Sequence, residues 1–154
     1  MINKLLPQSV DNTYRGHKLA LWLFALILVV KLFQSLMVVF NTNSTAIYAD
    51  GFPLGTFSPA AAQTVVALFA LSGLRLLIIL LLCVLVLVRY RSMISFMYAL
   101  LVLEYLAGQL LYHFVPLVRV GTPPGVFVNL MLFSLMVIGL VLSLWSQGNH
   151  KAKD

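Results

Sequence analysis

The sequence predicts an all-α integral membrane protein in which four transmembrane helices form an antiparallel up-down bundle. Hydrophobic residues make up 62% of the 154 residues and charged residues only 9%, whereas soluble domains are roughly 45–50% apolar and about 25% charged. Four apolar runs are also long enough to cross a bilayer, since roughly 20 helical residues span about 30 Å of hydrocarbon. We therefore expect residues 1–154 to form a single membrane domain.

The predicted transmembrane helices cover residues 19–40, 59–88, 93–115 and 125–146. Their leucine-rich, continuous composition favours helices, because membrane strands alternate apolar and polar residues. Ser58 followed by Pro59 predicts an N-cap and a first helical residue. Residues 41–58 form the longest connection, which we expect to be an outer loop. The short turn at residues 89–92 makes the second and third helices antiparallel neighbours.

Positive charge predicts the orientation of the chain. Seven of the ten Lys and Arg residues precede the first helix, fill the turn after the second or follow the fourth: Lys4, Arg15, Lys18, Arg89, Arg91, Lys151 and Lys153. The opposite side has only Arg119, so the positive-inside rule places both termini in the cytoplasm of a bacterial-type inner membrane. Residues 1–17 form a short cytoplasmic leader, in which a frayed terminus is favoured over an interfacial position for Leu5, Leu6 and Pro7. Because the basic residues are scattered at helix ends, the net charge of +6 does not indicate a nucleic-acid surface.

Three charged residues, Lys31, Arg75 and Glu104, interrupt the apolar runs. A charge at the centre of a transmembrane helix costs roughly 2.5–3.5 kcal/mol on insertion scales, so such residues are rare and mark candidate functional sites. Counting residues from the helix ends at 1.5 Å per residue places all three in one central layer. Lys31 and Glu104 are the pair best matched in depth, and Arg75 with Glu104 is the rival pair.

Two hypotheses explain this charged layer. In the structural hypothesis, Glu104 pairs with Lys31 or Arg75, and polar contacts help to hold the four helices together. In the functional hypothesis, the layer is a polar site inside the membrane. Two cations face one anion, so pairing within the chain leaves one positive charge over if all three groups are ionised. If Glu104 faces one basic residue and the other faces lipid, we expect a partner helix at the second.

Several neighbours of the charged residues supply polar groups or small side chains. The supporting residues are Gln34, Ser35, Ser72 and Gly108. Gly108 follows Glu104 by four residues on the same helix face, which predicts a close approach of a neighbouring helix. Gln109 is rotated away from Glu104. On the fourth helix, Gly139 and Ser143 have the small-xxx-small spacing that is typical of helix packing.

No sequence motif supports catalysis. The chain has no Gly-rich phosphate loop, nucleophile elbow or His-Glu metal signature, and its single cysteine, Cys83, has no partner. We therefore predict no catalytic residues, no metal site and no cofactor. Asp50, His113 and Arg119 belong to the outer face, where they form a candidate polar mouth.

The function predicted from these features is that of a small multi-pass inner-membrane protein, most consistent with a non-enzymatic accessory or interaction protein. Its surroundings are the lipid bilayer, and its candidate partners are another membrane protein or further copies of itself. The alternative is a small oligomeric proton- or ion-coupled transporter or channel subunit that uses Glu104. A membrane-embedded enzyme or redox carrier is the least favoured class, because few residues are suited to hold a redox centre.

Overall fold

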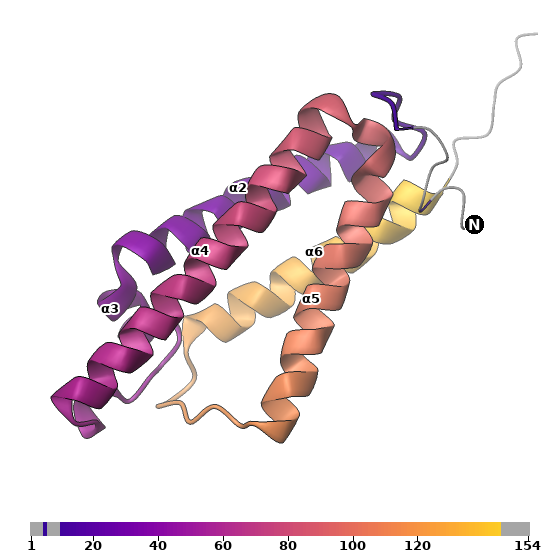
Figure 1. The fold of residues 1–154 in the computed structure, drawn as a ribbon. Helices are drawn as coiled ribbons and strands as arrows, with labels where there is room; N and C mark the ends of the chain where they lie inside the picture. Colours follow the sequence, from indigo (N-terminus) through magenta and orange to yellow (C-terminus); the bar gives the residue numbers. More distant parts are fainter. Residues whose placement is uncertain (1–4, 6–9, 146–154) are drawn as a thin grey trace, which may run out of the picture.

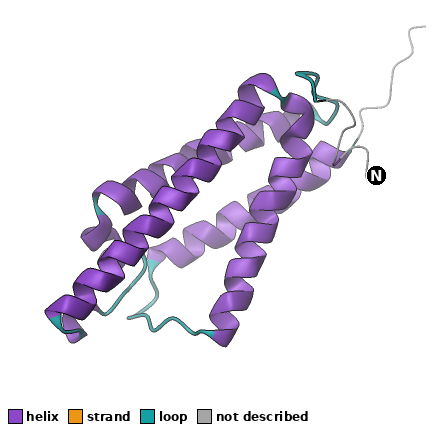
Figure 2. Cartoon of the chain, viewed as in Figure 1, coloured by secondary structure: helices purple, strands orange, loops and turns teal. Residues whose placement is uncertain are grey.

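The computed structural model describes residue 5 and residues 10–145, and all regular structure in this part of the chain is helical (Figure 2). The four long helices are α2 (Lys18–Phe40), α4 (Pro59–Arg89), α5 (Ile94–Phe114) and α6 (Pro124–Leu144). Each is long and apolar enough to cross a membrane, which confirms the prediction of four apolar helices. The helix ends lie within two residues of the predicted limits. The last predicted limit, residue 146, is outside the described residues.

Helix α2 is central to the packing (Figure 1). It lies beside α4, and it also contacts α6, which packs against α5. Helices α4 and α5 meet at the turn that joins them and separate away from it. The outward-facing side chains of all four helices are largely Leu, Val, Ile and Phe. Such a surface suits hydrocarbon rather than water, because large exposed apolar areas are unfavourable in a soluble monomer.

Side-chain caps define where two of the helices begin. The Ser58 hydroxyl accepts a hydrogen bond from the Ala61 N–H at 3.4 Å, and Pro59 is the first residue of α4, as the sequence predicted. At α2, Nδ1 of His17 accepts a hydrogen bond from the Leu19 N–H at 3.2 Å. Both caps satisfy backbone donors that have no partner within the first turn of a helix.

The connection at residues 41–58 is more ordered than a simple outer loop. It contains α3 (Thr42–Ser44), the π-helical turn η1 (Thr45–Ala49) and the 3₁₀ turn η2 (Leu54–Thr56). Ala46 and Leu54 are buried, so the segment packs onto the bundle. Gly51 adopts a φ of +72°, and its carbonyl accepts a hydrogen bond from the Val120 N–H at 2.8 Å. The connections after α2 and after α5 are therefore joined at the same end of the molecule.

A fully buried part of the core lies between α2, α5 and α6. Tyr98 is fully buried, and its hydroxyl donates a hydrogen bond to the Ala20 carbonyl at 2.8 Å. The ring of Phe24 meets the Tyr98 ring edge-on, with centroids 5.0 Å apart. On α6, Gly139 lies directly against the Tyr98 ring. This contact uses the small-xxx-small position that the sequence predicted for packing.

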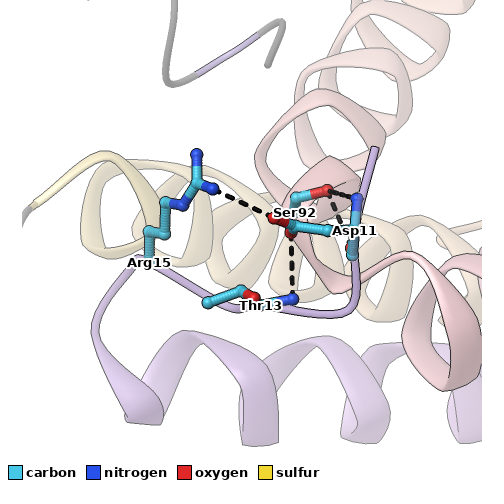
Figure 3. Close-up of polar contacts among 4 residues, drawn as sticks. All are labelled: Asp11, Thr13, Arg15 and Ser92. Atoms are coloured by element: carbon cyan, nitrogen blue, oxygen red, sulfur yellow. Dashed lines mark hydrogen bonds and ion pairs between the residues drawn. The ribbon is translucent and has the colours of Figure 1, made fainter. Parts of the chain in front are cut away.

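Residues 10–17 are tied to the turn between α4 and α5 (Figure 3). The Ser92 hydroxyl accepts a hydrogen bond from the Asp11 N–H at 3.1 Å and donates one to the Asp11 carbonyl at 2.9 Å. The Asp11 carboxylate accepts hydrogen bonds from the Thr13 N–H and the Arg15 guanidinium, both at 3.0 Å. These contacts hold residues 10–17 against the bundle; the expected frayed terminus, around Leu5 to Pro7, lies outside the described residues apart from residue 5.

Candidate functional site

The structure brings Lys31 and Glu104 together. Lys31 lies midway along α2 and is buried, with a relative exposure of 7%, and its Nζ is 3.9 Å from Oε2 of Glu104 on α5. This is an ion pair, but the distance is too long for a hydrogen bond. The Glu104 side chain is 48% exposed. The pair that the depth count favoured is thus the pair that forms.

A cavity of about 310 Å³ adjoins the ion pair. Its lining comes from α2, α4, α5, α6 and the connection before α6, and includes Lys31, Gln34, Glu104, Gln109, Arg119 and Asn129. Since a water occupies about 30 Å³ in the liquid, the cavity has room for several waters. Water here would satisfy the Lys31 ammonium, which has no hydrogen bond to any other described residue.

Arg75 does not join this pair. It lies on an exposed face of α4, and it has neither a hydrogen bond nor an ion pair with any residue that the structure describes. Of the two candidate pairs, the rival pair of Arg75 with Glu104 does not form among the described residues, and Arg75 is instead the basic residue that faces away from Glu104. The depth count places a residue along a helix but does not determine which way its side chain faces.

The supporting polar residues have different partners. The Gln34 amide donates a hydrogen bond to Oδ1 of Asn129 at 3.4 Å, which links α2 to α6. The hydroxyls of Ser35 and Ser72 instead donate to carbonyls three residues earlier in their own helices, at 2.9 and 2.6 Å. Of these supporting residues, only Gln34 makes a hydrogen bond to another helix. Interhelical hydrogen bonds of this kind contribute about 0.6 kcal/mol on average in membranes.

The expected close approach at Gly108 is wrong. A Cβ atom built at Gly108 would meet no atom within 4 Å, because α5 separates from α4 and a cavity occupies this position. Gln109, which we expected to be rotated away from Glu104, lines the same cavity. Close helix contacts occur instead at Gly73, against Val38, and at Gly139. Gly73 belongs to no packing motif in the sequence, and only its position next to the polar residue Ser72 could have drawn attention to it.

A second cavity of about 510 Å³ lies toward the end where α3 and η1 pack. Its lining includes Asn41, Tyr48, Asp50, Ser72 and Gly73. Gln34, Leu76 and Asn129 line both cavities. The hydrogen bond between Gln34 and Asn129 therefore lies at the boundary between the larger cavity and the cavity that adjoins the ion pair.

Asp50 and Arg119 interact electrostatically at this end of the molecule. Burial raises the pKa of the Asp50 carboxyl above its usual value, and the positive charge of Arg119 opposes that increase. The Arg119 guanidinium also lies 5.8 Å from the centre of the Tyr112 ring, within cation–π range. Two of the three residues predicted for a polar mouth, Asp50 and Arg119, thus interact with each other, whereas His113 packs its ring against Phe114.

The Asp50 carboxyl makes stability depend on pH. Its pKa is higher in the folded protein than in the unfolded chain, so its contribution favours folding most at low pH and weakens as pH rises through the folded pKa. We expect Asp50→Asn to remove this decline, which thermal unfolding in detergent micelles between pH 4 and about 7 would measure. Asp50→Glu keeps a carboxyl and should keep the decline; an unchanged profile in Asp50→Asn would contradict the assignment.

Neither a metal site nor a related protein provides further evidence on the candidate site. In the described part of the chain, no group of three or more His, Cys, Asp or Glu side chains is placed to hold a metal ion. Comparison with family models, with curated proteins and with solved structures finds no match to this chain. The candidate site therefore rests on its own geometry: an ion pair between buried Lys31 and half-exposed Glu104 beside a polar cavity, and a separate arginine on an exposed helix face.

Proposed function

We propose that the protein is a small multi-pass inner-membrane protein of bacterial type that acts as a non-enzymatic accessory, assembling with another membrane protein. The observation that supports this proposal is the exposure of Arg75 in the middle of an apolar helix, without an ion pair to any described residue. An arginine at the centre of a transmembrane helix costs roughly 2.5–3.5 kcal/mol, which a partner's acidic or polar group reduces. Catalysis is not part of the proposal.

We also propose an orientation of the chain in the membrane. An antiparallel up-down bundle with both termini in the cytoplasm follows from the positive-inside rule, because the basic residues flanking the helices gather at the termini and at the turn after α4. The α3–η1 segment and the connection before α6 then lie outside. In this orientation Asp50 and Arg119 face the external side of the membrane.

Site-specific photocrosslinking in native membranes tests the assembly. A photoreactive residue at Ile78, one turn from Arg75 and 54% exposed, is expected to capture a distinct membrane protein. The matched control is Leu103 on α5, which is 60% exposed and far from Arg75 in the sequence. Capture at Ile78 but not at Leu103 supports the proposal, and capture of lipid alone at both positions would contradict it.

The two adjoining cavities favour a second candidate, a transporter or channel subunit that uses Glu104. A polar cavity beside the ion pair meets a larger cavity at the Gln34–Asn129 hydrogen bond, so polar groups continue from the α3–η1 end toward Glu104. We expect substrate-dependent proton flux in liposomes that Glu104→Gln abolishes, since glutamine cannot exchange a proton. Absence of flux with a range of cations and anions would remove this candidate.

A further inference from the structure

The exposed face of α4 around Arg75 has a regular pattern. Leu68, Leu71, Arg75, Ile78, Leu82 and Leu85 follow one another at alternating spacings of three and four residues, and all six are exposed. This spacing places them along one side of a helix, as the a and d positions of a coiled coil are placed. We call these six residues the Arg75 face. Membrane helices commonly pack in this left-handed manner.

Arg75 lies near the middle of its helix. It is 16 residues after Pro59 and 14 residues before Arg89, which is about 24 Å and about 21 Å along the axis at 1.5 Å per residue. The hydrocarbon is about 30 Å thick, so a centred α4 places Arg75 near its midplane. Head groups are then far from the guanidinium, and a charged or polar group at the same depth is the natural partner.

The acidic residues of the chain are engaged elsewhere. Glu104 pairs with Lys31, and Asp11 pairs with Arg15 at 3.0 Å. Asp50 lies in the connection after α2, where it interacts with Arg119. The fourth, Asp154, follows the last transmembrane helix in the sequence and is outside the described residues. A carboxylate for Arg75 at the membrane midplane must therefore come from another molecule.

The balance of charges indicates whether the partner of the Arg75 face is a second copy of this chain or a different protein. Each copy brings Lys31, Arg75 and Glu104, which together carry one positive charge in excess when all are ionised. Association of any number of copies keeps one excess cation for each copy, so self-association does not neutralise the layer. A different helix that carries one carboxylate neutralises it completely.

We infer that the Arg75 face binds a transmembrane helix of another protein that carries a Glu or Asp at the depth of Arg75. This inference rests on the proposed accessory function and adds the chemistry of the partner. The guanidinium forms a fork of donors that matches a carboxylate, which gives charge and direction to the contact. The leucines on either side supply the packing surface, and the single charged position sets the register, as a polar residue at one a position does in coiled coils.

Synthetic helices test this chemistry directly. The purified protein is reconstituted in phosphatidylcholine vesicles with Lys-flanked polyleucine peptides that carry Glu, Gln or Leu at the centre, and association is measured by energy transfer. We expect the central-Glu peptide to bind about three- to thirtyfold more tightly than the Leu peptide, as one polar interhelical contact provides. A Glu placed near the peptide end should lose this advantage, because its depth no longer matches Arg75.

Variants of α4 complete the experiment. Arg75→Leu should abolish the preference for Glu, and Arg75→Lys should keep part of it because the charge remains without the fork. Val84→Ala is the matched control, since Val84 is 42% exposed and lies nine residues after Arg75, on the opposite side of α4. Equal binding of the Glu and Leu peptides, or a preference for Glu that survives in Arg75→Leu, would overturn the inference.

Two further outcomes name other occupants. Loss of the Glu preference when phosphatidylglycerol replaces part of the phosphatidylcholine would show that Arg75 reaches lipid phosphates, which overturns the inference. Arg75-dependent self-association without peptide, measured by sedimentation, would assign the face to a second copy and would also overturn it. The crosslinking at Ile78 separates the two proposals: capture of a protein with no intramembrane acid sustains the accessory function and defeats this inference.

Discussion

Replacement of Gly139 by leucine is expected to prevent the protein from accumulating in folded form. A Cβ atom at this position would overlap the ring of Tyr98. The ring has no free space to move into, because it is fully buried, packs against Phe24 and holds the Ala20 carbonyl through its hydroxyl. Overpacking of a tight core typically costs about 1–3 kcal/mol, occasionally more, and leucine adds three more carbon atoms beyond the Cβ.

Gly108 supplies the matched control for this prediction. It also lies within a long helix, but a Cβ atom there would meet nothing within 4 Å. Gly108→Ala is therefore expected to leave stability unchanged or slightly raised, whereas Gly139→Ala should already lower it. Detergent-solubilised abundance and thermal unfolding of these three variants and the wild type measure this. Equal effects of alanine at the two positions would contradict the packing between α5 and α6.

The Lys31–Glu104 pair provides the second large effect. Glu104→Leu is expected to lower stability by on the order of 3 kcal/mol, because it leaves the buried Lys31 ammonium without its counter-charge. Lys31→Leu should cost less, since the Glu104 side chain is 48% exposed and lines the cavity, where water can hydrate it.

The double variant distinguishes an ion pair from two independent charges. Replacing both residues of a buried pair with apolar ones is often neutral or stabilising, so Lys31→Leu/Glu104→Leu should recover most of the stability lost in Glu104→Leu. Unfolding of the wild type, both single variants and the double variant in the same detergent measures the coupling. Additive losses would show that the 3.9 Å contact does not couple the two side chains energetically.

These experiments also discriminate between the two candidate functions. A structural pair predicts that the double variant regains abundance and keeps its crosslinking at Ile78. A transporter that uses Glu104 predicts that the double variant regains abundance but loses flux, because the exchanging carboxyl is gone.

Local sequence patterns were sufficient to predict the positions of the helices. The lengths of the apolar runs, together with Ser58 and Pro59, placed the helix ends within two residues of their observed positions. Position along a helix also follows from the sequence, and depth alone favours Lys31 over Arg75 as the partner of Glu104, which is the pair that forms. Such properties depend on a residue and its near neighbours, so they do not require knowledge of the packing.

Rotation about the helix axes was decided only by the tertiary structure. Every face of these helices is apolar, so hydrophobic periodicity does not show which face is buried. Close contacts at Gly73 and Gly139 determine that rotation, and they direct Arg75 away from the bundle while leaving a cavity at Gly108. The sequence by itself thus determined four apolar helices and the depth of their charges; the packing at two glycines decided which charges meet, because only contact between helices distinguishes one apolar face from another.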